Sequence, residues 1–351
     1  SRIMQRVEQR MAEGKETTIN FLAISGGGDW GAFGSGFLVG WGEAPDPQYR
    51  RPDFDAVTGV STGALLAPFV FVGTDEAVVG GGTLSRNPQT SWIQARGLLF
   101  FMPWNPSFLT IPGLREDIEN SATREFVSAM AEQSRKGKVL IISATDVDLG
   151  RQRFWGIGPL AEAAESTGDL KSVTRYMLAS SAIPVAFPPV EIDDGLYIDG
   201  GVTANVFLRL NTQDPHSFLQ RWMQKHPGVP VPKVRYWVIV NNQLEQSPAT
   251  VQRRWPVILT PSLNTSTRSA TIAQIQLLAT EAYYANSRYG TNIELRVVAI
   301  PNDWRPPVDG IFEKQTMRSL SDLGRKMGAD PSSWQLWAAP SGLGLTPIYA
   351  P

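Results

Sequence analysis

Residues 54–67 read FDAVTGVSTGALLA, and both the fold and the candidate chemistry are organised around Ser61 in this stretch. Its first residues favour a short strand, and the Ala/Leu-rich residues after Gly63 favour a helix. A Gly-x-Ser-x-Gly turn between a strand and a helix is the nucleophile-elbow pattern, in which the turn presents the serine hydroxyl at the positive end of the helix. A plain strand-to-helix turn has the same pattern, so the motif alone leaves both interpretations open.

A second glycine-rich turn lies upstream of this stretch. Residues 18–24 (TINFLAI) favour a buried strand, and residues 37–41 (FLVGW) favour an apolar helix. The loop that contains the turn, residues 25–34, reads SGGGDWGAFG. In such a loop between a strand and a helix, backbone N–H groups are free to point at an anion.

Three interpretations compete for this loop. The spacing Gly26-x-Gly28-x-x-Gly31 matches the dinucleotide-binding fingerprint, but the fingerprint expects an acidic residue at the end of the next strand. Here the aspartates precede that strand, and the strand ends in the serine turn instead. Alternatively, the amides of Gly26, Gly27 and Gly28 form an oxyanion hole, because no Cβ keeps an oxyanion away from them. The structural alternative is a turn that only permits tight packing.

Asp199 is the second candidate catalytic residue. It ends a short apolar strand in the stretch LYIDGG, residues 196–201. In α/β sheets, ligands bind where strand ends meet loops. An aspartate before glycine is also a common turn residue. Asp199 is therefore a catalytic candidate only because the chain also contains the two glycine motifs.

Strands and helices alternate along the remaining chain. Strands are expected at 138–145, 151–155, 234–240 and 294–300, and helices at 121–136, 173–181, 267–286 and 312–327. This alternation predicts an α/β fold with a central, largely parallel sheet. Without a repeat or linker, residues 1–351 are expected to form a single domain, with an amphipathic helix or tail at 1–17. Residues 73–115 are expected to be irregular, either a lid or wall for an apolar substrate or a loop packed on the core.

The composition narrows the function classes. Of 351 residues, 42% are hydrophobic and the net charge is -1, which argues against nucleic acid and against strong attraction to anionic membranes. The absence of cysteine excludes disulfides and thiol catalysis, and two histidines argue against a histidine-rich metal site. No apolar run is long enough to span a bilayer, and no metal or cofactor is indicated. The chain begins at Ser1 instead of Met, which leaves open a processed form exported to the cell envelope or beyond.

Three motifs in chain order, together with a proline-rich stretch, resemble the patatin-like phospholipases over about residues 18–330. The motifs are Gly26-Gly27-Gly28-x-x-Gly31, Gly59-x-Ser61-x-Gly63 and Asp199-Gly200-Gly201, and the stretch is ASSAIPVAFPP at 179–189. The resemblance implies a three-layer α/β sandwich. It also implies a lipid acyl hydrolase of phospholipase A or lysophospholipase type, with Ser61 as nucleophile, Asp199 as its base, an acyl-serine intermediate and an oxyanion hole at residues 26–28. The implied partner is lipid at a membrane or micelle interface.

One departure from the family pattern concerns substrate binding. The family often has Arg or Lys two residues after the third glycine, where this chain has Trp30, so recognition of a phosphate head group is in doubt. Trp30, Trp104 and Phe108 are the candidate substrate-binding residues, the last two within an apolar stretch that suits contact with lipid.

Two other functions compete with this interpretation. The chain order Ser61, Asp199, then His216 or His226 also fits a Ser-His-Asp α/β-hydrolase esterase, although both histidines lie in polar, proline-flanked segments expected to be exposed loops. A catalytically silent lipid-binding protein would share the fold without the reaction.

Overall fold

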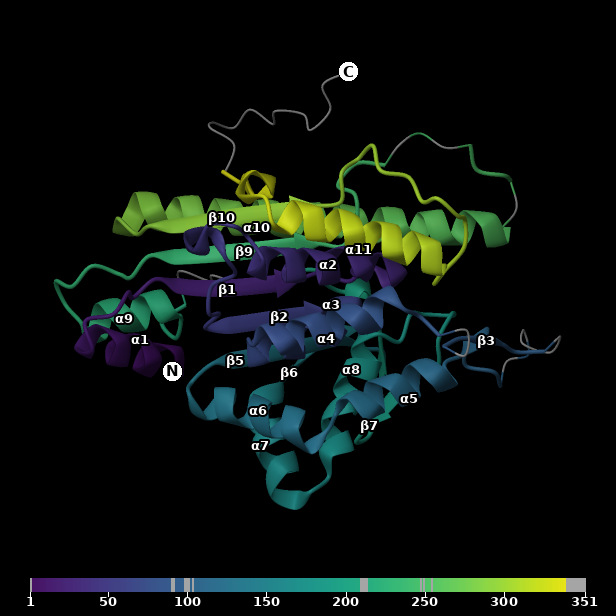
Figure 1. Ribbon diagram of the computed structural model, residues 1–351, viewed down its shortest axis with the longest axis horizontal. Coiled ribbons are helices and arrows are strands. Elements are labelled where there is room, and N and C mark those ends of the chain that lie inside the picture. Colours follow the sequence, from purple (N-terminus) through teal and green to yellow (C-terminus); the bar gives the residue numbers. More distant parts are fainter. Residues whose placement is uncertain are drawn as a thin grey trace.

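The computed structural model describes residues 2–89, 92–97, 102, 104–208, 214–246, 248, 250–253 and 255–338. Within these residues, nine strands form one sheet in the order β11-β10-β9-β1-β2-β5-β8-β7, with β6 also paired to β5 (Figure 1). The strands are β1 (Ile19–Ile24), β2 (Ala56–Val60), β5 (Val139–Asp146), β6 (Arg151–Gly156), β7 (Val190–Ile192), β8 (Gly195–Ile198), β9 (Val234–Val240), β10 (Ile293–Ala299) and β11 (Gln335–Leu336).

The middle of the sheet is parallel. Strands β10, β9, β1, β2 and β5 all run in the same direction, so their carboxyl ends meet at one edge. The strands toward the two edges, β11 on one side and β6, β8 and β7 on the other, are antiparallel to their neighbours. The expectation of a largely parallel central sheet is therefore confirmed, and the carboxyl edge is where the loops after β1 and β2 come together.

Helices cover both faces of the sheet. They are α1 (Arg2–Ala12), α2 (Gly31–Gly42), α3 (Thr62–Val72), α4 (Asp75–Arg86), α5 (Pro112–Ser121), α6 (Arg124–Arg135), α7 (Ile157–Thr167), α8 (Thr174–Ser180), α9 (Phe218–Lys225), α10 (Trp255–Tyr289) and α11 (Lys314–Gly328). Leu22 and Ile24 of β1 pack in one core with α2, α3, α8 and α11, whereas Phe21 and Ala23 pack in a second core with α1, α9 and α10. Because side chains alternate across a strand, this division gives three layers, as expected.

The segment expected to be irregular contains two helices. Residues 75–86 form α4 despite Gly80, Gly81 and Gly82, so the expectation for this part of 73–115 was wrong. Glycine disfavours a helix by roughly 1 kcal/mol each, but a Cβ on Gly81 would lie 2.9 Å from the Phe69 ring and one on Gly82 would lie 3.0 Å from Val39. Close packing of α4 on its neighbours therefore outweighs local propensity. Much of the expected lid, residues 98–101 and 103, lies outside the described residues.

The helices near the two histidines also differ from expectation. Residues 218–225 form α9, so His216 precedes a helix and His226 ends it, and of the two only His216 is exposed. The helix expected at 267–286 runs from Trp255 to Tyr289. No helix among the described residues combines the length and the apolar character that crossing a bilayer requires.

Candidate active site

Ser61 lies at the sharp turn between β2 and α3, at the carboxyl edge of the sheet. Its backbone has φ 52° and ψ -125°, a left-handed conformation that non-glycine residues rarely adopt. A Cβ on Gly63 would lie 2.1 Å from the Ile24 carbonyl oxygen, so only glycine fits at that position of the turn. The strand, sharp turn and helix expected for a nucleophile elbow are therefore all present.

Two serines at the end of α8 hold the Ser61 backbone on both sides. The Ser61 N–H donates to the Ser180 hydroxyl at 2.9 Å, and that hydroxyl donates to the Ser143 carbonyl oxygen of β5 at 2.6 Å. The Ser181 hydroxyl donates to the Ser61 carbonyl oxygen at 3.1 Å. All of these groups are buried. An unfavourable backbone conformation persists only where its surroundings enforce it, and these bonds provide that enforcement.

Asp199 reaches the same place from the far side of β5. It follows β8, and its N–H donates to the Ala182 carbonyl oxygen at 2.8 Å. Burial raises the pKa of Asp199 to about 6, although hydrogen bonds from the Ser61 hydroxyl and the Gly201 N–H oppose the shift. The Gly201 N–H lies 2.7 Å from the Asp199 Oδ1. A buried carboxyl with a raised pKa thus lies close enough to the serine hydroxyl for the hydroxyl to affect that pKa.

The glycine loop after β1 packs directly against Ser61. A Cβ on Gly26 would lie 2.8 Å from the Ser61 Cβ, which explains the need for glycine there. The Gly26 N–H donates to the Asn205 Oδ1 at 2.9 Å, so this amide is already engaged. Gly28 has φ 59° and borders the cavity at Ser61. Of the three amides expected to form an oxyanion hole, those of Gly27 and Gly28 remain candidates, and Gly26 sets the close contact between the two loops.

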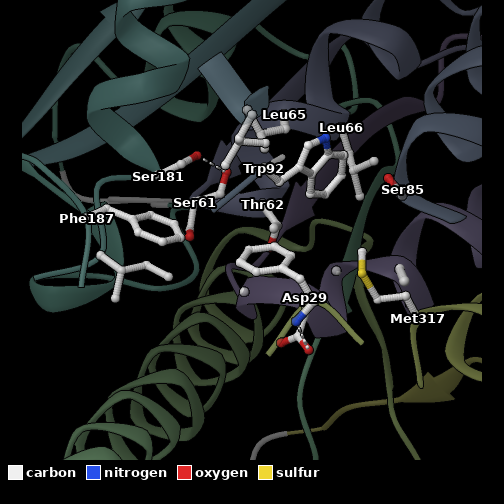
Figure 2. Close-up of a pocket in the computed structure, with 16 residues that line it drawn as sticks. Asp29, Ser61, Thr62, Leu65, Leu66, Ser85, Trp92, Ser181, Phe187 and Met317 are labelled. Carbon is white, nitrogen blue, oxygen red and sulfur yellow. Dashed lines mark hydrogen bonds between the residues drawn. The ribbon is translucent and has the colours of Figure 1, made fainter. Parts of the chain in front are cut away.

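A largely apolar cavity opens beside Ser61 (Figure 2). Besides Ser61, its polar lining residues are Asp29, Thr62, Ser85 and Ser181. Burial raises the pKa of the Asp29 carboxyl, which accepts a hydrogen bond from the Phe312 N–H at 3.2 Å.

The remaining candidates do not line this cavity. Trp30, Trp104 and Phe108 are not among its lining residues, so their roles in substrate binding stay predictions. The His226 Nε2 lies 2.8 Å from Glu8 of α1, and its ring packs on a tryptophan of α9. His216 is exposed before α9. Figure 1 shows α1 and α9 together at the left end of the sheet, whereas the strand arrows of β1 and β2 point to the right.

Sequence reasoning missed several groups that build the site. Asn205 fixes Gly26, and Asn241, directly after β9, donates to the Ser25 carbonyl oxygen and accepts from the Gly34 N–H, both at 2.8 Å. A polar residue at the end of a buried strand was a usable signal for Asn241, but nothing local marked Asn205. The serines of α8 lay in the quoted stretch at 179–189 without a stated role. Among the described residues, no group of three His, Asp or Glu side chains is arranged to hold a metal ion.

Comparison with known proteins agrees with the arrangement of these motifs. The family model for patatin-like phospholipases matches residues 22–210, which is more than half of the chain. The chain therefore belongs to the patatin-like phospholipase family. No curated protein matches the sequence.

Among solved structures, the chain is similar to VipD from Legionella pneumophila and to the type III effector protein ExoU. For VipD the identity is 13% and the TM-score 0.39, covering 91% of this chain and 68% of VipD. For ExoU the identity is 13% and the TM-score 0.36, covering 89% of this chain and 52% of ExoU, so this chain spans about half of that protein.

The raised pKa of Asp199 predicts a change in stability when its charge is removed. Between about pH 4 and pH 6 the unfolded chain loses this proton while the folded protein keeps it, so the fold loses stability as the pH rises. A pKa raised from 3.8 to about 6 corresponds to about 3 kcal/mol. Asp199→Asn should therefore increase the free energy of unfolding at pH 8, and the gain should vanish toward pH 4. Urea unfolding at both pH values measures this, and a variant that is less stable at pH 8 would contradict it.

The bonds from α8 predict that Ser180 positions Ser61. Ser180→Ala leaves the buried Ser61 N–H without its acceptor, which should lower the free energy of unfolding by about 1–3 kcal/mol. It should also lower kcat for a soluble ester with little change in KM, because the hydroxyl is displaced and the cavity is not. Ser172→Ala is the matched control, since that surface hydroxyl donates only to the Asp169 carbonyl oxygen. Unchanged kcat in folded Ser180→Ala would refute the positioning role.

Proposed function

We propose that this protein is a lipid acyl hydrolase that cleaves carboxylic ester bonds of phospholipids or related acyl lipids. It would be a serine hydrolase of phospholipase A or lysophospholipase type, in which Ser61 and Asp199 act as a dyad. The observation that carries this proposal is the proximity of the Ser61 hydroxyl to the buried Asp199 carboxyl, whose pKa the hydroxyl lowers, with Ser61 at the wall of an apolar cavity. Family membership supports it independently.

In the first half of the reaction, the Asp199 carboxylate takes the proton of the Ser61 hydroxyl while the serine oxygen attacks the ester carbonyl carbon. A pKa of about 6 makes Asp199 a stronger base than an ordinary aspartate and still leaves it ionised at neutral pH. The carbonyl electrons move to the oxygen, where the amides of Gly27 and Gly28 would stabilise the negative charge. One such donor typically contributes on the order of 3 kcal/mol to lowering the barrier.

In the second half, the tetrahedral intermediate collapses and expels the alcohol, which takes the proton from Asp199. The acyl group remains on the Ser61 oxygen. Asp199 then takes a proton from water as the water attacks the acyl carbon, and collapse of the second intermediate releases the carboxylic acid and returns the proton to Ser61. Besides the substrate and water, these steps use Ser61, Asp199 and the amides of the glycine loop.

The competing Ser-His-Asp mechanism lacks a histidine at the site. His226 is engaged with Glu8, and His216 is exposed before α9. A silent lipid-binding protein is disfavoured because it has no need for a buried carboxyl against a serine hydroxyl, an arrangement that costs stability. Trp30 packs edge-on against Trp304, with ring centroids 5.2 Å apart, and supplies no cation for a phosphate head group. Neutral acyl lipids are therefore included in the proposed substrate class.

Four single variants test the assignment of the dyad. Ser61→Ala and Asp199→Ala should each reduce hydrolysis by about a thousandfold, the scale of lost nucleophilic or general-base catalysis. His216→Ala and His226→Ala should retain activity. Mass spectrometry of products from a mixed lipid extract, with Ser61→Ala as reference, identifies the acyl donor. A folded histidine variant without turnover would favour the Ser-His-Asp mechanism, and unchanged lipids with the wild-type protein would favour the binding protein.

The interfacial partner can be tested at Trp104, whose exposed fraction of 74% is the largest among the described bulky hydrophobic residues. Placing an indole at a lipid surface is favourable, and a carboxylate there is repelled. Trp104→Asp should reduce hydrolysis of lipid vesicles at least fivefold while leaving a soluble short-chain ester unaffected. Tyr49→Asp, another exposed aromatic, is the control. Equal losses on both substrates would remove Trp104 from the interface.

A further inference from the structure

A second cavity adjoins the one beside Ser61, and we call it the distal cavity. The two cavities share part of their walls: Leu65, Leu66, Ser85, Trp92 and Leu114 line both. The distal cavity extends from this shared wall toward α4, α5 and α6, where Leu84, Ile118 and Phe126 line it.

Trp92 stands at the boundary between the two cavities. Its ring packs edge-on against Phe312, which lines only the cavity beside Ser61, with centroids 5.7 Å apart. Its Nε1 donates to the Asp117 Oδ2 at 2.6 Å, and Asp117 lines only the distal cavity. Figure 2 shows the Trp92 ring next to Leu66, on the far side of the cavity from Phe187. An occupant that passes from Ser61 into the distal cavity must run along Trp92 and the leucines of α3.

The polar groups indicate which chemistry the distal cavity accepts. Its polar side chains all form hydrogen bonds within the protein. The hydroxyls of Ser85 and Ser121 each donate to a backbone carbonyl oxygen of their own helix. The Asp117 carboxylate accepts from the side chains of Trp92 and Gln89. The Thr62 hydroxyl, next to Ser61, has no partner among the described residues. Unmet hydrogen-bonding capacity thus lies at the Ser61 end, and the distal cavity suits an apolar occupant.

The length of the combined path follows from α3. Its residues line the path from Ser61 to Phe69, which is about 12 Å along a helix axis. An extended chain spans about 1.2 Å per single bond, so roughly ten bonds cover this distance. A butanoyl group on Ser61 is too short to pass the shared wall, whereas a chain of roughly ten carbons reaches the part of the distal cavity at Phe69.

We propose that the substrate's acyl chain runs from Ser61 past Trp92 into the distal cavity, so that the protein selects long-chain acyl esters. This inference rests on the proposed function, because it places the acyl group on Ser61. The distal cavity binds the far half of the chain, and its walls set the preference for length. Each methylene group that is buried there raises kcat/KM by up to about fourfold.

The test compares p-nitrophenyl butyrate, octanoate and dodecanoate. Leu84→Trp and Ile118→Phe narrow the distal cavity from two different helices and do not touch the cavity beside Ser61. Each should hydrolyse butyrate like the wild type and dodecanoate at least tenfold less efficiently in kcat/KM. Val79→Trp is the matched control, because Val79 is exposed on the same helix as Leu84 and lines neither cavity. It should behave like the wild type on all three esters.

Retained hydrolysis of butyrate shows that a variant is folded, so a selective loss on dodecanoate in either distal variant supports the inference. The inference would be overturned if both distal variants hydrolysed dodecanoate with wild-type kinetics. It would also be overturned if both variants lost butyrate and dodecanoate hydrolysis to the same extent. A wild-type protein that cleaves none of the three esters would instead contradict the proposed function, so the two failures are distinguishable.

Discussion

The left-handed backbone of Ser61 is the constraint on which the rest of the site depends. A single residue must turn the chain from β2 into α3 with its side chain outward, and this conformation is unfavourable for any residue with a Cβ. The surroundings compensate with hydrogen bonds to both sides of the residue from α8. Because α8 leads directly into the segment that bonds the Asp199 N–H, the same element links the two reactive groups.

Burial of the Asp199 carboxyl favours the proposed reaction and lowers the stability of the fold. Removing Asp199 from water disfavours its charged form, which makes it a better base and a less stable part of the fold. The two adjoining cavities are both lined mainly by apolar groups, and the Ser61 hydroxyl lies at the wall of the first. An acyl lipid has a polar ester at one end and a hydrocarbon chain beyond it, which suits a reactive serine beside apolar walls. The proposed reaction and the proposed chain selection thus depend on neighbouring parts of one site.

Elements whose signals are local were predictable from the sequence. The strand, turn and helix around Ser61 and those around Gly26 lie within about 25 residues each, and apolar pattern and glycine spacing identify them. Helix α4 was missed because glycines disfavour a helix locally. Here they allow the helix to pack closely on Phe69 and Val39, and this packing is not visible in the local sequence. The bonds from Ser180 and Asn205 were missed because their partners lie more than 100 residues away.

The most direct test of the account is the rate at which a fluorophosphonate labels the protein as a function of pH, with the adduct located by mass spectrometry. We predict a single adduct on Ser61 whose rate of formation rises with pH around a midpoint near 6, the pKa of Asp199. Asp199→Asn should label about a hundredfold more slowly and without that pH dependence. An adduct on another residue, or equally fast labelling of Asp199→Asn, would contradict the claim that these two groups act together.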